Sequence, residues 1–306
     1  MQQPKHLSPG DKVIILATAR KISQEEIQAA VNIFSAWGLE VLIGSSIGKA
    51  FHQYAGTDSE RMQDLQQALD NPEIRGIFCA RGGYGTMRII DDLDFTAFKA
   101  HPKWIVGYSD ITVLHAHIQQ TFGIQSIHAL MPVNFAGLAV YDPSISSLKA
   151  ALFGEPLKYV NEFESPGMRV KNRPGEAQGI LVGGNLSLIY ALQGSLSDLD
   201  TQGKILFLED LDEHLYHIDR MILSLKRSGK FKGLSALIVG GMTDMKDNTI
   251  PYGKTAEEII MEHVSEYNYP IAFGFPAGHT KDNRALILGK KISLKVEEDK
   301  VFLGFD

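Results

Sequence analysis

The chain has 306 residues and a mass of 33.8 kDa, enough for two domains with sizeable hydrophobic cores. Hydrophobic residues make up 44% and charged residues 22%, which is typical of a globular protein and excludes disordered and fibrous classes. The 36 acidic and 30 basic side chains give a net charge of −6, which argues against binding to nucleic acid or to anionic membranes.

The sequence contains one cysteine, Cys79, so an intrachain disulfide is impossible and an oxidising compartment is not required. The first apolar run, residues 13–17, is too short for the core of a signal peptide. No segment approaches the roughly 20 apolar residues of a membrane span. We therefore expect a cytoplasmic protein without a membrane partner.

The first half of the chain alternates short apolar runs with amphipathic segments. Ser23 and Glu26 have the spacing of a capping box, and Gly38 is placed to end the helix that they begin. This alternation predicts an α/β domain with a mostly parallel sheet, helices on both faces and ligands at the carboxyl ends of its strands. The expected strands are 12–18, 40–47, 74–80, 104–107 and 125–130, and the expected helices are 23–38, 58–70, 111–122 and a last one from about 143.

Residues 156–176 are polar, rich in turn formers and without clear periodicity, so we expect a linker there. It divides an N-terminal domain of residues 1–155 from a C-terminal domain of residues 177–306. In the second part we expect strands at 177–182, 204–208, 234–239 and 271–275, helices ending near 194 and at 217–228 and 255–267, and a hairpin of 291–296 with 300–305.

The most informative segment runs from Trp104 to Thr112. An apolar strand ends at Gly107, Ser109 occupies the turn, and a helix begins within two residues. Such a turn can lift a nucleophilic hydroxyl clear of the sheet, and the following N–H, that of Asp110, can stabilise an oxyanion. The second glycine of the usual elbow is missing, so a simple helix cap by Ser109 or Asp110 is the alternative interpretation.

A second glycine-containing turn, Arg81-Gly82-Gly83-Tyr84-Gly85, also follows a strand. Glycines let the backbone approach a ligand closely. The turn could supply an oxyanion donor opposite Ser109, hold a phosphate or nucleotide, or be a tight turn alone. The usual dinucleotide and phosphate-loop signatures are absent.

A serine nucleophile needs a base and an acid that orients the base. Of the ten histidines, His279 has the most suitable setting, because it lies in a loop directly after a strand. Glu209 and Asp210 stand at the end of the apolar run 204–208. The run from Glu209 to His217 could instead ligate a metal, although a solvated acidic face is the plainer interpretation. Cys79 fits a buried strand position.

Together, these segments resemble the LD-carboxypeptidase family, also called muramoyltetrapeptide carboxypeptidases. The matching segments occur in the order of the family, and Leu7-Ser-Pro-Gly-Asp11 also fits. They are Ala80-Arg-Gly-Gly-Tyr-Gly85, Gly107-Tyr-Ser-Asp110, Gly183-Gly-Asn-Leu186, Leu208-Glu-Asp210 and Gly274-Phe-Pro-Ala-Gly-His279.

The resemblance implies a serine peptidase with a Ser-His-Glu triad. By position, Ser109 is the nucleophile, Glu209 the orienting acid and His279 the base, while the N–H groups of Asp110 and Gly83 form the oxyanion hole. The implied fold is an N-terminal flavodoxin-like three-layer domain and a smaller C-terminal α/β domain with a β-barrel-like sheet. The site then lies between the domains and needs no cofactor or metal.

The implied reaction releases terminal D-alanine from cytosolic murein tetrapeptides by hydrolysis of an L,D amide bond, and the resemblance also implies a homodimer. A free substrate carboxylate needs a cationic receiver, for which Arg81 is our candidate; Tyr84 is a second candidate substrate-binding residue.

Two alternative functions stay open. One is an immunity peptidase of the same family that cleaves aminoacyl-nucleotide antibiotics, and the other is a non-catalytic module that binds a small anion.

Overall fold

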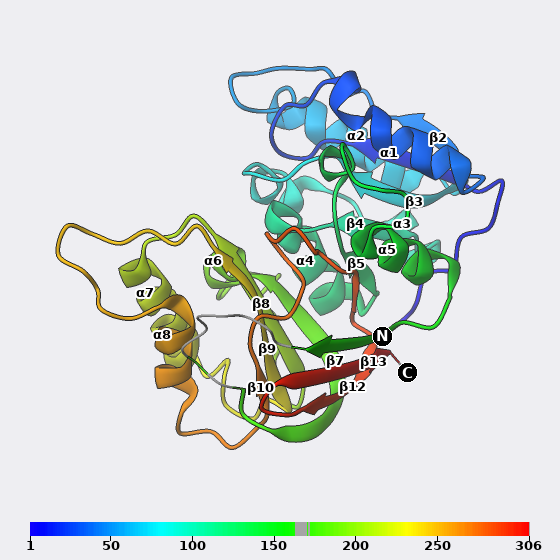
Figure 1. Cartoon of the computed structure of the whole chain (residues 1–306). Coiled ribbons are helices and arrows are strands. Elements are labelled where there is room, and N and C mark those ends of the chain that lie inside the picture. Colours follow the sequence, from blue (N-terminus) through cyan, green and yellow to red (C-terminus); the bar gives the residue numbers. More distant parts are fainter. Residues whose placement is uncertain (163–169, 171, 306) are drawn as a thin grey trace.

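Two β-sheets, each with its own helices, organise the chain (Figure 1). The computed structural model describes residues 1–162, 170 and 172–305. Five strands of the first sheet are parallel and lie in the order β2-β1-β3-β4-β5, which is the flavodoxin-like order. These strands are β1 (Lys12–Leu16), β2 (Glu40–Ile43), β3 (Ile74–Cys79), β4 (Trp104–Gly107) and β5 (Ser126–His128).

Helices cover both faces of this sheet, so the expected three-layer arrangement is confirmed. Apolar side chains of α2, α3 and α4 pack on one face, and those of α1 and α5 pack on the other. The capping box of Ser23 and Glu26 begins α1 as predicted. The helices are α1 (Gln24–Ala36), α2 (Asp58–Asp70), α3 (Thr96–Ala100), α4 (Thr112–Phe122) and α5 (Pro143–Phe153), with short 3-10 turns η1 (Thr86–Arg88), η2 (Ile90–Asp92), η3 (Ser109–Ile111) and η4 (Pro132–Asn134).

The second sheet is mixed, with the order β10-β9-β8-β7-β12-β13-β6. Its β7 to β10 half is parallel and its other half is antiparallel, including the predicted hairpin of β12 with β13. The strands are β6 (Lys158–Glu162), β7 (Gly175–Asn185), β8 (Ile205–Leu211), β9 (Ala236–Thr243), β10 (Ile271–Ala272), β12 (Lys291–Val296) and β13 (Lys300–Phe305), and the helices are α6 (Leu186–Ala191), α7 (Leu215–Arg227) and α8 (Ala256–Val264).

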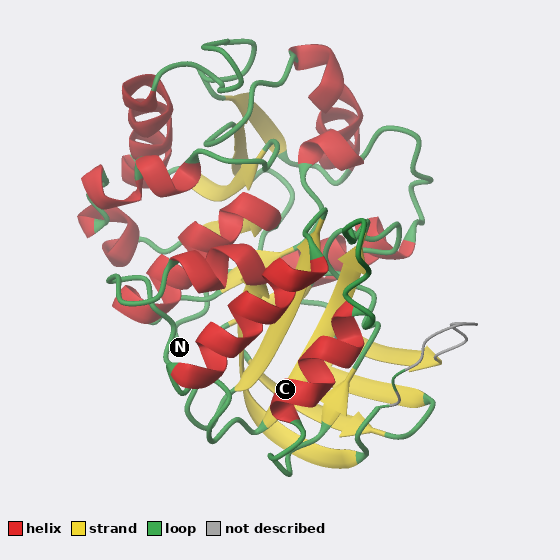
Figure 2. Ribbon diagram, turned by 90° about the vertical axis from the view of Figure 1, so that its left-hand side faces the viewer, coloured by secondary structure: helices red, strands yellow, loops and turns green. Residues whose placement is uncertain are grey.

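The second sheet curls toward a barrel, as the two views show (Figures 1 and 2). Beyond β6, the N–H of Arg173 donates to the Ile271 carbonyl at 2.9 Å, and the Ile271 N–H donates back at 3.1 Å. Arg173 lies two residues before β7, so this bridge joins the chain at the start of β7 to β10, an outer strand of the sheet.

Two strands were not expected from the sequence. Strand β6 lies inside 156–176, the range predicted to be a linker, of which residues 163–169 and 171 are outside the described residues. Strand β11 (Leu286–Leu288) leaves the second half of the chain to pair antiparallel with β5 of the first sheet. Both strands are short, and both are defined by partners far away in the sequence.

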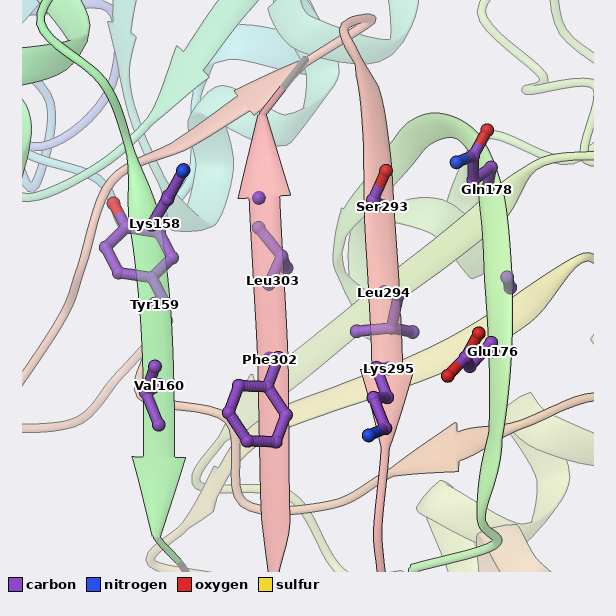
Figure 3. A pocket seen from close by; sticks show the side chains of 12 residues that line it. Lys158, Tyr159, Val160, Glu176, Gln178, Ser293, Leu294, Lys295, Phe302 and Leu303 are labelled. Atoms are coloured by element: carbon purple, nitrogen blue, oxygen red, sulfur yellow. The ribbon is translucent and has the colours of Figure 1, made fainter.

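The outward face of β6, β13, β12 and β7 forms a shallow hollow of about 540 Å³ (Figure 3). Lys295 lies over the ring of Phe302 on this face, with 5.7 Å between the ammonium and the ring centre. None of the sequence-predicted site residues lines the hollow.

The two sheets share one apolar core, because the helix that follows Ser109 packs against the second sheet. Helix α4 contacts β7 and α6. The Asn185 N–H donates to the Thr112 hydroxyl at 3.0 Å, and a Cβ added at Gly184 would lie 2.6 Å from that hydroxyl. The Gly183-Gly184-Asn185 motif therefore brings the two sheets into contact beside the turn that carries Ser109. Within the described residues, no helix has the length and apolar character to cross a membrane.

We predict that Gly183→Ala destabilises the protein strongly. Its φ of +127° disfavours a side chain, and an added Cβ would lie 1.9 Å from the Phe207 carbonyl oxygen. Strand β7 must shift to accommodate it, at a cost of about 2–4 kcal/mol in the free energy of unfolding. Urea denaturation measures this cost. The matched control is Gly304→Ala in β13, where no atom lies within 4 Å of an added Cβ; equal stability of the two variants would contradict the prediction.

Candidate active site

Ser109 lies at a sharp strand-to-helix turn. Strand β4 ends at Gly107, Ser109 has a φ of +63°, and the 3-10 turn η3 leads directly into α4. A left-handed conformation costs a non-glycine residue about 1–2 kcal/mol, and such strain clusters at functional sites. An added Cβ at Gly107 would lie 2.8 Å from the Ile111 side chain, so this glycine permits the turn.

The glycine loop after β3 packs directly on Ser109. A Cβ at Gly82 would lie 3.1 Å from the Ser109 hydroxyl oxygen, so only glycine allows this approach without a shift. Gly83 has a φ of +112°. Among the described residues, the N–H groups of Gly83 and Asp110 have no hydrogen-bond acceptor. Two unused N–H groups on the segments that flank Ser109 are suited to bind a developing oxyanion.

Glu209 and His279 form a buried hydrogen-bonded pair. Glu209 ends the apolar run of β8 and is fully buried, and its Oε2 accepts hydrogen bonds from the His279 ring Nδ1 at 2.7 Å and from the His279 N–H at 3.2 Å. Gly278 makes the approach possible, because a Cβ there would lie 2.6 Å from the same oxygen. A carboxylate at Nδ1 places the ring proton there and leaves Nε2 free to accept a proton.

The environment shifts the pKa values of this pair in opposite directions. Burial alone would raise the pKa of Glu209, but the imidazoles of His128 and His279 outweigh it and hold that pKa below its ordinary value. Burial alone would lower the pKa of His279, but the hydrogen bond and charge of Glu209 outweigh it and raise that pKa above 6.5. Glu209 is therefore ionised beside His279 at neutral pH.

Tyr108 connects the serine turn to the pair. Its ring centre lies 4.8 Å from that of His279, so the residue next to Ser109 contacts the predicted base. Among the described residues, no hydrogen bond joins the Ser109 hydroxyl to the His279 ring. Such bonds are often long in unliganded enzymes and tighten when substrate binds.

The two predicted substrate-binding residues, Arg81 and Tyr84, belong to the glycine loop and reach the surface. Arg81 is 3.6 Å from the Glu26 carboxylate and lines a hollow of about 370 Å³ together with Lys21 and Lys49. Tyr84 is 44% exposed, with its ring 6.3 Å from that of Tyr54. The Glu26 carboxylate also lines the hollow, so three basic side chains and one acidic side chain leave its lining positive on balance.

The acidic run that begins at the end of β8 has structural partners. Asp210 accepts hydrogen bonds from Asn185 at 2.9 Å and from the Ser187 N–H at 3.0 Å, which anchors the start of α6. Glu213 pairs with His217. In the part of the chain that the structure describes, no group of three or more metal-ligating side chains is placed to hold an ion. Cys79 is buried, which raises the pKa of its thiol to about 12.

The sequence analysis missed two arginines around the glycine loop. Arg61 is fully buried in α2 and donates to the carbonyls of Thr18 and Gly85, the latter at 3.0 Å. Arg61 lies four residues before Leu65 and seven before Ala68, and this helical spacing could have indicated that Arg61 lies on the buried face of α2. Arg20 lies so close to the loop that a Cβ at Gly83 would be 2.2 Å from its Cδ.

Comparison with known proteins gives the same family in both halves of the chain. Residues 13–129 match the LD-carboxypeptidase N-terminal domain, and residues 178–294 match the LD-carboxypeptidase C-terminal domain. A probable murein peptide carboxypeptidase of Bacillus subtilis is 34% identical over 300 residues, covering 97% of this chain and 92% of the relative.

Two further proteins represent the two kinds of relative. The crystal structure of muramoyltetrapeptide carboxypeptidase from Oxalobacter formigenes is similar with a TM-score of 0.85 and 27% identity, covering 96% of this chain and 98% of that one. The microcin C7 self-immunity protein of Escherichia coli is 26% identical, covering 93% of this chain and 90% of its own.

We predict that Glu209→Gln lowers the pKa of His279 to below 6.5. The substitution removes the carboxylate charge that stabilises the imidazolium, whereas the burial that disfavours it remains. A titration of the assigned His279 ring by NMR measures the pKa. The control is Glu213→Gln, which alters the partner of His217 and leaves the His279 titration unchanged. An unchanged His279 pKa in Glu209→Gln would show that the pair is not electrostatically coupled.

Proposed function

Because the chain belongs to the LD-carboxypeptidase family, we propose that it is a serine peptidase that releases terminal D-alanine from murein tetrapeptides. The scissile amide joins the L-centre of diaminopimelate or lysine to a D-residue. The observation that carries this proposal is the Glu209–His279 hydrogen bond of 2.7 Å beside a serine with a φ of +63°.

In this proposal Ser109 is the nucleophile and His279 the base. The Ser109 oxygen attacks the carbonyl carbon while its proton moves to Nε2 of His279, and Glu209 holds the ring and stabilises the imidazolium. Bound substrate must draw the hydroxyl and Nε2 into hydrogen-bond distance. The N–H groups of Gly83 and Asp110 receive the oxyanion. His279 then protonates the departing amine of D-alanine, and water attacks the acyl-enzyme with His279 as base.

We propose that Arg81 receives the free carboxylate of the substrate. It lines a hollow with Lys21 and Lys49, and a guanidinium can bind a carboxylate through two parallel hydrogen bonds. Tyr84, exposed on the same loop, contributes to the wall of the substrate site. A peptide with a free C-terminal carboxylate is thereby preferred to an amidated one.

The remaining features of the proposal rest on the sequence and the family. A homodimer is implied by the resemblance, and a cytoplasmic location agrees with a murein tetrapeptide substrate. The division at 156–176 is supported by the two family models, which match residues 13–129 and 178–294 on either side of it.

A second candidate function is favoured by the similarity to the microcin C7 self-immunity protein. An enzyme of that kind would cleave an aminoacyl sulfamoyl adenylate with the same three side chains. Parallel assays with a murein tetrapeptide and with this compound separate the two functions. A non-catalytic module would cleave neither, and a phosphonofluoridate would not label its Ser109.

We predict that Ser109→Ala lowers kcat at least about 10³-fold without loss of folding, because no other group can form the acyl-enzyme. Release of D-alanine, measured by mass spectrometry, checks turnover, and circular dichroism checks folding. Glu209→Gln costs less, since its role is supportive. The control is Ser35→Ala on the exposed surface of α1. Near-full activity of pure Ser109→Ala protein would refute the mechanism.

We predict that Arg81→Met raises KM for the tetrapeptide about 10- to 100-fold with little change in kcat, since the lost ion pair is equally strong in substrate and transition state. The same variant should no longer distinguish the tetrapeptide from its C-terminal amide. The control is Arg227→Met at the end of α7. If the preference for a free carboxylate persists in Arg81→Met and is lost in Arg20→Met, then Arg20 is the receiver instead.

A further inference from the structure

His128, the last residue of β5, is a buried histidine that the proposed mechanism does not use. It is 0% exposed, and neither ring nitrogen has a hydrogen-bond partner among the described residues. A buried polar group without a partner is unfavourable, so such a group in a folded protein calls for an explanation.

The Glu209 carboxylate carries the matching unpartnered atom. Its Oε2 is engaged by His279, whereas its Oε1 is buried and accepts no hydrogen bond in the described part of the chain. Nε2 of His128 lies 3.9 Å from this Oε1. A bridging water would need the two atoms about 4.5 Å apart or more, because each hydrogen bond spans about 2.8 Å. The gap therefore suits a direct bond after a small approach.

The surroundings of His128 leave it few other partners. Its ring centre lies 5.0 Å from that of Phe207 in an edge-on contact and 5.8 Å from that of Tyr108. His115 lies 6.5 Å away, and its Nε2 already bonds the Gly107 carbonyl at 2.9 Å. Within the described residues, Glu209 is the only carboxylate within 4 Å of a ring nitrogen of His128.

We propose that His128 is a positioning residue that donates a hydrogen bond from Nε2–H to Oε1 of Glu209 in the working enzyme. The inference rests on the proposed role of Glu209 and deepens it. His128 belongs to the first sheet, which carries Ser109, and Glu209 belongs to the second, which carries the pair with His279. The bond therefore crosses between the sheets and fixes the acid relative to the nucleophile.

Loss of this donor changes the pH dependence of catalysis in a definite direction. Without Nε2–H, the Glu209 carboxylate has less stabilisation, so the Glu209–His279 pair takes up a proton more readily. Since the base must be unprotonated, the acidic limb of kcat/KM moves to higher pH. Among the described residues, Tyr108 after β4 and Asp210 on β8 also face the pair, and His115 on α4 faces the His128 ring. These groups are unchanged in a His128 variant.

The experiment compares His128→Met, which removes the donor, with His128→Gln, whose amide can place an N–H near the position of Nε2. We expect kcat of His128→Met to fall roughly tenfold or more with little change in KM, and its acidic limb to move up by about half a pH unit or more. His128→Gln should restore most of the wild-type kcat and most of the wild-type pH dependence. The control is His117→Met, which removes the 3.0 Å bond from α4 to Ser197 and should change thermal stability but not the pH profile.

A wild-type pH profile in folded His128→Met, or a His128→Gln variant as impaired as His128→Met, would overturn the proposal. Should neither variant fold, NMR of the wild-type imidazole nitrogens decides: a proton on Nε2 of His128 supports the bond, and a proton on Nδ1 alone overturns it. This readout does not depend on turnover. Failure of the wild-type protein to release D-alanine would instead refute the proposed function.

Discussion

The structure around the site depends on one buried charge, the carboxylate of Glu209. A fully buried carboxylate is tolerated only when hydrogen bonds and opposite charge replace the water that it loses. Its Oε2 takes both the ring and the backbone N–H of His279, so the acid holds the loop as well as the imidazole. The same contact explains Gly278, because a side chain at that position would collide with the carboxylate. Stability of the loop and orientation of the base thus have a single origin.

A second constraint is the close approach of glycine backbone around the turn that carries Ser109. In the loop after β3, Gly82 approaches Ser109 and Gly83 lies against the Arg20 side chain, while Gly184 of β7 approaches Thr112 in the helix that follows Ser109. At each of these positions an added Cβ would lie 3.1 Å or less from a neighbouring side chain. The glycine motifs in the sequence are therefore explained by close packing at one point, where the ends of strands from two sheets converge.

The regular elements of the first sheet were predictable because their signals are local. The capping box at Ser23 and Glu26 acts within one helical turn and is confirmed, and the helix expected from about 143 begins at Pro143. Strands β6 and β11 were missed because they are defined by partner strands at least 138 positions away in the sequence, such as Gly304 for Lys158 and His128 for Leu286. The candidate site residues could be predicted because they lie at strand ends and in glycine-containing turns. Arg61 was missed because its burial shows only in its position on the apolar face of a helix.

The role of β11 shows how such non-local pairing bears on the site. Leu286 pairs with His128, so the segment just after His279 is anchored to the strand that ends at His128. The loop carrying the base is thereby attached to both sheets, through Glu209 on β8 and through β11 on β5. Relative movement of the sheets would strain this loop before it separated Ser109 from His279. Such an attachment holds the loop of His279 near the turn that carries Ser109, and bound substrate then completes the alignment of the Ser109 hydroxyl with the His279 ring.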